Sequence, residues 1–381
     1  MADIFRWLKK FSVARRVARW LRHDVRDACY DVARRLTPAW PRLGPVKGLF
    51  SACEALRAGV LPGRVVMEAQ ESKLAGPSSL RQLSRLEQDQ FQPWPIFWTQ
   101  HRQARLIGPT ALLVNERKQA CSEALFNRKF HDDPGCYLLH LPKPVELAGN
   151  WTSVLSRWAL GGNYYHWLMD CLPRLAVLGE LPSDTRILVP APPHSFQKET
   201  LRLLGLEGRT HAVTEPHLVV ENYYFSAPTA MTGCANPYAV KFLRERFLPL
   251  ADVNGPTHEK IYIQRRGGNR GMVNEAELVA FLKGRGWSVV ALESLTFAQQ
   301  VNLFRGARAV CGLHGAGFTN LLWCPPGCVA VELVAHNFLN GCYEGLAGHV
   351  GVEHRFLVNQ ADAEFRILVD LIQLAAVLGD L

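Results

Sequence analysis

The chain has 381 residues, of which 48% are hydrophobic and 20% charged, an ordinary balance for a globular protein. This length exceeds what one hydrophobic core usually serves, so we expect two α/β domains. The net charge of +9 is concentrated in residues 1–42, which hold eleven Lys and Arg against four acids. A nucleic-acid binder spreads positive charge over a folded face, so this distribution argues against nucleic acid as a partner.

The cysteines and the N-terminus indicate the compartment. None of the ten cysteines forms a Cys-x-x-Cys pair, and most lie in apolar runs, as is typical of reduced core residues in a cytosolic protein. No apolar run reaches the ~18 residues that span a bilayer. Basic residues also interrupt the N-terminus too often for a signal peptide. We therefore expect a cytoplasmic protein.

Residues 1–45 form a basic segment of their own. Apolar residues recur at helical spacing up to Pro38, with arginines between them, and predict a helical extension. In one interpretation, residues 1–36 bind the anionic inner face of the cytoplasmic membrane peripherally. In another, the helix packs on the protein with its arginines in solvent, and a contact with a partner protein is a third. The sequence leaves these alternatives open.

We assign residues 46–252 to an N-terminal α/β domain. Short apolar segments indicate strands at 111–114, 137–141 and 145–147. From residue 163 the patterns sharpen. They predict helices at 163–178, 195–204 and 236–250 and strands at 186–189 and 218–225.

After a break at 252–256, strands and helices alternate regularly. Strands are predicted at 261–263, 287–292, 309–312 and 329–333, with helices at 275–283, 297–304 and 316–321 between them. A further strand is expected at 354–358 and a closing helix at 362–378. This alternation predicts a parallel sheet with right-handed crossovers. We assign 253–360 to a Rossmann-like domain and 361–381 to the closing helix. Two such domains, 46–252 and 253–360, would face a cleft, which is where open parallel sheets bind ligands.

The exit of the strand at 261–263 is rich in arginine and glycine. Arg265, Arg266 and Arg270 surround a Gly-Gly pair in this segment. Guanidinium groups bind phosphates bidentately, and glycine allows close backbone approach, so the segment is suited to cradle a diphosphate. The alternative is an ordinary basic loop.

The exit of the strand at 309–312 is a turn of small residues. His314, Gly315, Ala316 and Gly317 run into a short helix that contains Asn320. A helix start offers N–H groups to an anion, so we predict phosphate binding here, with tight packing as the alternative. The glycine spacing is not the dinucleotide fingerprint and does not indicate a nicotinamide cofactor.

Two acids, Glu332 and Asp170, are further candidate site residues. Glu332 ends the strand at 329–333, where we predict a sugar or ribose contact, with a surface-exposed or salt-bridged side chain as the alternative. His166 and Asp170 share one helix face, and a carboxylate that orients an imidazole makes a general base. The alternative for this pair is a structural brace near Pro173. We assign Asn163 and Arg174 of the same segment to the acceptor side.

These motifs, in this order, resemble glycosyltransferase family 61. The matching segments are 163–175, 262–266 with Arg270 and residues 274–275, 297–304 with Ala307, 312–320 and 325–333. The resemblance covers roughly 150–335 and implies a GT-B-like fold of two Rossmann-like domains, with the nucleotide sugar held mainly by the C-terminal one. It also implies inverting transfer, often of xylose or N-acetylglucosamine, commonly without a bound metal. Eukaryotic members lie behind an anchor in the secretory pathway; the absence of a predicted span here suggests a bacterial-type enzyme.

We therefore expect an inverting glycosyltransferase that uses a nucleotide-sugar donor, UDP-linked, with no metal and no cofactor. Its acceptor would be a glycan or lipid-linked glycan in the biosynthesis of surface polysaccharide such as capsule or lipopolysaccharide. His166 or Asp170 would be the base. The arginines after 263, the turn at 314–317 and Asn320 would hold the donor, and Glu332 its ribose. The alternatives are another GT-B nucleotide-sugar enzyme, such as an epimerase, and a non-catalytic carbohydrate-binding or assembly protein.

Overall fold

The computed structural model describes residues 46, 48–68, 80, 94–125, 133–138, 141–157, 159–230, 232–265 and 271–381. The predicted extension over 1–45 lies outside these residues, as do Arg266 and Arg270. The chain divides into two compact units built from interleaved segments. Unit 1 comprises the described residues up to Gly63 with Thr99–Trp151 and Val213–Phe225, and unit 2 comprises Arg64–Trp98, Thr152–Ala212 and Ser226–Leu381. The predicted domain boundary at 252/253 falls inside unit 2, and that division stays a prediction.

Unit 1 is built on a sheet with the strand order β1-β5-β4-β3-β9-β6. The strands are β1 Gly48–Phe50, β3 Ile96–Ile107, β4 Leu112–Val114, β5 Gln119–Cys121, β6 Val145–Ser153 and β9 His217–Ser226, and β2 Gly63–Met67 begins at the boundary between the units. The helices are α4 Ala52–Arg57 and the 3-10 turns η3 Ser122–Ala124 and η6 Pro134–Tyr137. The strands predicted at 111–114 and 145–147 are confirmed. The strand predicted at 137–141 is wrong at Tyr137, because Asp133 caps a helical turn that begins with Pro134.

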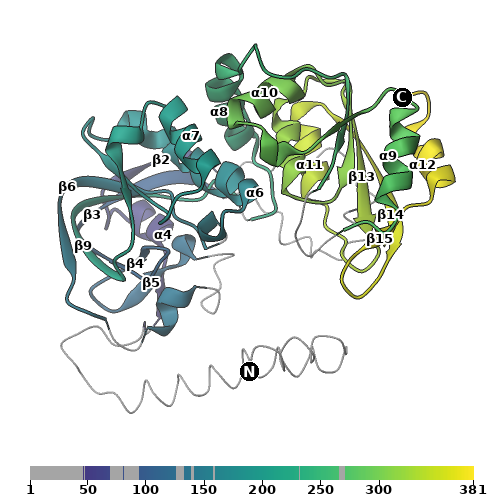
Figure 1. Ribbon diagram of the computed structural model, residues 1–381. Coiled ribbons are helices and arrows are strands. Elements are labelled where there is room, and N and C mark those ends of the chain that lie inside the picture. Colours follow the sequence, from purple (N-terminus) through teal and green to yellow (C-terminus); the bar gives the residue numbers. More distant parts are fainter. Residues whose placement is uncertain are drawn as a thin grey trace. The chain divides into compact units, whose positions relative to one another are not determined.

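Unit 2 contains a six-stranded sheet with the order β11-β10-β12-β13-β14-β15 (Figure 1). The strands are β10 Lys260–Ile263, β11 Ser288–Val290, β12 Ala309–Leu313, β13 Val329–Ala335, β14 Glu353–Ala361 and β15 Ile367–Leu368. β10 to β14 pair in parallel, and β15 is antiparallel to β14. The predicted parallel sheet is confirmed. Since β11 lies on one side of β10 and the later strands on the other, the order reverses at β10.

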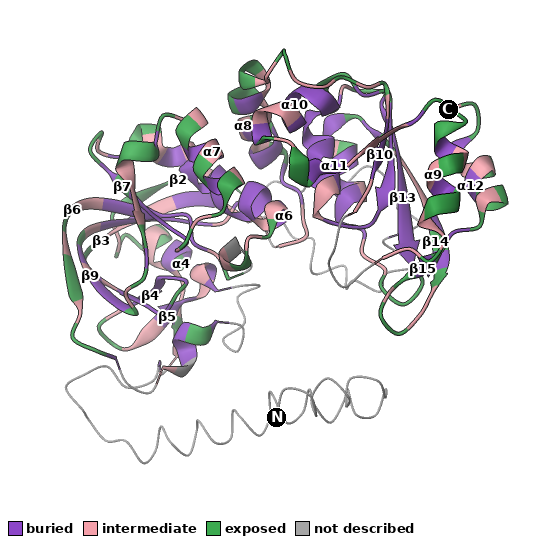
Figure 2. Cartoon of the chain, viewed as in Figure 1, coloured by how far each residue is buried: buried purple, intermediate pink, exposed green. Residues whose placement is uncertain are grey.

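Helices cover both faces of this sheet. α9 Glu275–Lys283 and α12 Leu371–Leu378 lie on one face, and α10 Phe297–Arg305, the 3-10 helix η13 Ala316–Trp323 and α11 Cys342–Val350 lie on the other (Figure 1). Neighbouring residues of a strand therefore join different cores: Ala330 packs with α10 and α11, and Val331 packs with α9 and α12. β13 is buried along its whole length (Figure 2), as expected for a central parallel strand.

The remaining elements of unit 2 precede this sheet in the chain, except the 3-10 turn η12, which follows β11. They are η7 Ala159–Gly161, α6 Tyr164–His166, a π-helical turn Trp167–Cys171, the 3-10 helix η9 Leu172–Glu180, β7 Arg186–Val189, α7 Ser195–Leu203, η10 Glu207–Arg209, β8 Thr210–Ala212, α8 Pro237–Phe247, η11 Leu248–Leu250 and η12 Leu292–Ser294. The segment predicted as one helix at 163–178 is helical throughout, but it changes type twice. None of the described helices is long and apolar enough to cross a membrane.

Two expectations near the C-terminus need correction. The closing helix was predicted to begin at residue 362, but it begins at Leu371, because the Asp370 side chain accepts from the N–H groups of Ile372 and Gln373. Residues before it form β15 instead. The helix α11 was not predicted at all.

Candidate functional site

Unit 2 contains a cavity of about 680 Å³, a volume typical of small-ligand sites. Its wall includes Gln264 and Arg265, which directly follow β10, and Leu313 and Gly315 at the end of β12. These neighbouring strands are where the strand order reverses. The cavity therefore lies at the carboxyl edge of the sheet, at the topological switch point where open parallel sheets bind ligands.

Four helical segments begin at the wall of this cavity. The lining residues at these starts are Asn163 and Tyr164 of α6, Ser195 and Phe196 of α7, Thr296 and Phe297 of α10, and Gly315 and Ala316 of η13. Helix starts carry partial positive charge. The start of α10 already holds an anion of the protein itself, because the Glu199 carboxylate accepts from the N–H groups of Phe297 at 2.8 Å and Ala298 at 3.1 Å. The cavity wall thus combines several partial positive charges with one acid that is hydrogen-bonded to a helix start.

Arg265 brings a full positive charge to the cavity. Its Nη1 atom donates to the backbone oxygen of His314 at 3.4 Å, so the loop after β10 contacts the turn after β12. A Cβ atom on Gly315 would lie only 3.0 Å from this Nη1 atom. The glycine therefore leaves room for the guanidinium at this position. Gly315, Ala316 and Gly317 all line the cavity, and their predicted role in holding phosphate stays a prediction.

Asn320 lies in the cavity wall, but its amide is used within the protein. Its Oδ1 atom accepts from Tyr164 at 2.9 Å and Trp323 at 3.0 Å, and its Nδ2 atom donates to Gln300 at 3.0 Å and to the backbone of Gly317 at 3.2 Å. The side chain is fully buried. Asn320 therefore fixes the shape of the cavity by joining α6, α10 and η13.

His166 and Asp170 form the expected pair. His166 Nδ1 lies 2.7 Å from Asp170 Oδ2, and Thr232 Oγ1 donates to the same carboxylate oxygen at 2.7 Å. The π-helical turn that begins at Trp167 carries Asp170, and such turns are frequent at functional sites. The contact with Nδ1 leaves Nε2 as the atom that can accept a proton. Neither residue is part of the cavity wall, although Asn163 and Tyr164, which begin the same helical segment, are.

The two residues assigned to the acceptor side have different environments. Asn163 lines the cavity and caps α6, where its side chain accepts from the His166 N–H at 3.3 Å. Arg174 is buried, and its guanidinium donates to the backbone oxygens of Ser226 and Leu155, both at 2.8 Å. These contacts show that Arg174 joins segments of unit 2, and it does not line the cavity.

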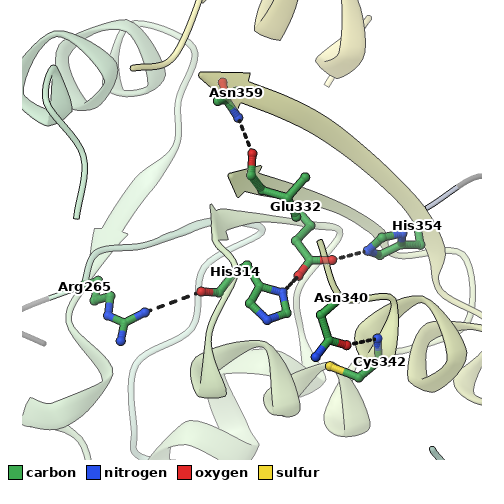
Figure 3. Close-up of polar contacts among 8 residues, drawn as sticks. Arg265, His314, Glu332, Asn340, Cys342, His354 and Asn359 are labelled. Atoms are coloured by element: carbon green, nitrogen blue, oxygen red, sulfur yellow. Dashed lines mark hydrogen bonds and ion pairs between the residues drawn. The ribbon is translucent and has the colours of Figure 1, made fainter. Parts of the chain in front are cut away.

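Glu332 does not face the cavity, so the predicted ribose contact is not supported. Its side chain is fully buried on β13, where Oε1 accepts from His314 Nδ1 and Oε2 accepts from His354 Nε2 at 2.8 Å (Figure 3). Burial alone would raise the pKa of Glu332, but the charge of His314 and the hydrogen bonds from both histidines outweigh it and lower the pKa to about 2. Glu332 is therefore a buried anion that orients His314.

Three residues of these networks were not anticipated from the sequence: Glu199, Thr232 and His354. Each acts through a partner that is at least twenty residues distant, and none stands in a local motif. In the described part of the chain, no group of three or more His, Cys, Asp or Glu could hold a metal ion. All of the nine described cysteines except Cys234 are buried.

Comparison with known proteins agrees with this geometry. A family model described as Glycosyltransferase 61 matches residues 164–331. The chain is also similar to the EGF domain-specific O-linked N-acetylglucosamine transferase of Drosophila melanogaster, with 32% identity over 139 residues, which are 35% of this chain and 26% of the fly protein. The chain thus spans about a quarter of the length of that relative. The matched residues contain His166 and Asp170, the loop after β10, the 315–317 turn and most of the parallel sheet. Residues 164–331 therefore belong to the glycosyltransferase 61 family.

Proposed function

We propose that this protein is a glycosyltransferase that moves a sugar from a nucleotide-sugar donor to an acceptor hydroxyl. The observation that carries the proposal is the cavity at the switch point, where Arg265 and the 315–317 turn meet within the family segment. A nucleoside diphosphate is an anion that a guanidinium and a helix start both favour. The volume of about 680 Å³ is suited to a ligand of this size.

The proposed reaction is a direct displacement at the anomeric carbon with inversion. The imidazole of His166, oriented by Asp170, takes the proton of the acceptor hydroxyl as its oxygen bonds to the sugar. The bond between the sugar and the diphosphate breaks, and the leaving group keeps the electron pair. Arg265 and the start of η13 stabilise the charge that develops there. This mechanism needs no metal or cofactor from the protein.

The donor half of a GT-B-like fold would be the sheet of unit 2. Five parallel strands with helices on both faces, and a cavity at their carboxyl edge, support this assignment. Arg266 and Arg270 would add cations to the loop after β10.

A donor screen tests the proposal most directly. Thermal shifts would be measured with UDP-, GDP- and CMP-sugars, beginning with UDP-N-acetylglucosamine because the fly relative is named for that sugar. A true donor at a hundredfold excess over its Kd adds about 2.7 kcal/mol of stability. Arg265→Ala should abolish most of the shift. If no nucleotide or nucleotide sugar stabilises the wild-type chain, the proposal fails.

The role of His166 has its own test. With the identified donor, His166→Ala should lower the transfer rate by about a hundredfold or more, because it removes the proposed base, while donor affinity stays unchanged. His258→Ala, outside the cavity wall, is the matched control. Transfer at the wild-type rate by a folded His166→Ala variant would exclude His166 as the base.

The acceptor is proposed to be a glycan or lipid-linked glycan of surface polysaccharide. An EGF-like domain, which the name of the fly relative indicates, is the competing acceptor. Product analysis with each acceptor class separates them. The same assay without acceptor detects an epimerase, and donor binding without turnover would indicate a non-catalytic carbohydrate-binding protein.

A further inference from the structure

The triad of His314, Glu332 and His354 fixes two protons. A carboxylate can only accept hydrogen bonds, so both imidazoles must donate to Glu332 (Figure 3). His314 therefore holds a proton on Nδ1 and His354 holds one on Nε2. A further proton on either of the other two nitrogens, His314 Nε2 or His354 Nδ1, would make that ring an imidazolium.

The surroundings of these two nitrogens differ. His354 Nδ1 is buried, and no described residue provides it with a hydrogen-bond partner. An imidazolium at this position would leave a charged N–H group without an acceptor, which costs more than an unpaired lone pair. His314 lies at the end of β12 beside the glycine turn, and its ring contacts Phe338 and Tyr343. Its Nε2 atom is not among the buried atoms that lack a partner in the described residues.

A fully buried carboxylate such as Glu332 requires a compensating positive charge. The titratable groups around it are His314, His354 on β14, and Cys342 and Tyr343 on α11. Burial, and then the charge of Glu332, raise the pKa of Cys342, so its thiol is neutral. Arg265 contacts the backbone oxygen of His314 and not the carboxylate. The compensating charge therefore resides on one of the two imidazoles.

We propose that His314 carries this charge as an imidazolium held by Glu332, and that His354 is a positioning residue that holds Glu332 in place. The effect of this charge on donor binding rests on the proposed function. Leu313 and Gly315, which flank His314 in the chain, line the cavity. A positive charge behind the 315–317 turn stabilises the diphosphate of the donor and the charge that it gains as the sugar leaves.

Nitrogen NMR of the full chain with labelled histidine tests the charge without any ligand. The signals of His314 are assigned by their loss in His314→Asn. At pH 7.5 we expect both ring nitrogens of His314 to be protonated, and those of His354 to show a neutral ring with its proton on Nε2. Glu332→Gln should convert His314 to a neutral ring. A neutral His314 in the wild type, or a His314 still charged in Glu332→Gln, would overturn the proposal.

Binding of UDP, measured by calorimetry at pH 7.5, tests whether the charge of His314 contributes to binding of the donor diphosphate. Loss of one charged interaction predicts roughly tenfold weaker binding by Glu332→Gln. His354→Gln keeps a donor to Glu332 and should bind as the wild type does. His354→Leu removes that donor and should lose affinity together with the imidazolium signature. Equal binding by all three variants would overturn the link to the donor.

Glu123→Gln provides the matched control for the removal of a buried carboxylate. Glu123 lies in unit 1, and its hydrogen bonds from described residues all come from neutral groups, including the hydroxyls of Ser51 and Ser122. This variant should alter neither the His314 signals nor the affinity for UDP. If the wild type does not bind UDP, the proposed UDP-linked donor fails while the NMR experiment still decides the charge of His314.

Discussion

At the residue scale, the absence of a side chain at residue 315 leaves room for Arg265 to contact the turn after β12. In Gly315→Ala, the new Cβ atom would lie 3.0 Å from Arg265 Nη1, so the guanidinium must shift by a few tenths of an ångström, and we expect its 3.4 Å bond to the His314 oxygen to break. We expect the affinity for the nucleotide-sugar donor to fall roughly tenfold, since a charge-assisted hydrogen bond is lost. Calorimetric titration with the donor measures this.

Gly306→Ala is the control for that substitution, because no atom lies within 4 Å of its new Cβ and the residue only ends α10. Its donor affinity should equal that of the wild type. An unchanged affinity in Gly315→Ala would mean that Arg265 does not need its observed position to bind the donor.

Single residues were predictable from the sequence where their partner is local. His166 and Asp170 are four residues apart on a helix, so their contact follows from the spacing. For Glu332 the sequence left open a sugar or ribose contact and a salt bridge, because a position near the end of an apolar run does not show which residues surround the side chain. Its partners His314 and His354 come from β12 and β14, which only the sheet brings together.

At the scale of elements, α10 depends on a cap from another helix. Glu199 of α7 accepts from two N–H groups at its start, in addition to the local cap of Thr296. Glu199→Ala should destabilise unit 2 by about 1–2 kcal/mol, because it removes charge-assisted bonds at a helix start. Amide exchange should accelerate first in α10.

Glu245→Ala is the comparison for this element. Its ion pair with Lys241 is 3.8 Å long and both side chains are largely exposed, so its loss should change stability by less than about 1 kcal/mol. Equal protection of α10 in the wild type and Glu199→Ala would show that Thr296 alone caps the helix.

Elements with a clear local pattern were predicted well, and those without one were not. α9 and the strands β7, β10 and β12 follow from periodicity and strand composition. α11 was missed because Gly345 and Gly348 lower its helix propensity. β15 was taken for helix because Ile367 forms backbone hydrogen bonds with Gly271 and Val273, which lie far earlier in the chain, so no local window contains these partners.

At the scale of the whole molecule, the chain order does not reveal the compact units. Unit 1 joins Thr99–Trp151 to Val213–Phe225 across a long segment of unit 2. The strand order places β9 between β3 and β6. Such non-local pairings have no signature in composition, so the sequence predicted contiguous domains. The parallel sheet of unit 2 was predictable because its strands and helices alternate along one continuous segment.

The two units should respond to acid in different pH ranges. In unit 1, burial lowers the pKa of His101 from 6.5 to about 4. Burial also lowers the pKa of His217; a hydrogen bond to the Pro142 oxygen partly opposes this shift, and the charge of Arg105 adds to it. Both histidines bind protons more readily when unfolded, so their contribution to stability is lost as the pH falls below 6.5. For His101 this reaches about 2 kcal/mol at pH 5. In unit 2, Glu332 stabilises the fold above its unfolded pKa of 4.5, and this contribution is lost only as the pH falls through about 2.

Hydrogen exchange corrected for the intrinsic pH dependence measures this difference. Between pH 7 and pH 5, protection in β3 and β9 of unit 1 should fall, whereas protection in β12 and β13 of unit 2 should fall less. The double variant His101→Gln with His217→Gln should remove the difference between the units, because no imidazole with a lowered pKa is then left among the described residues of unit 1. Equal losses of protection in both units of the wild type would show that these histidines do not set the acid response. Among the described residues of unit 2, the acids with a lowered pKa, Glu332 and Asp362, lose their contribution to stability only below pH 4.5.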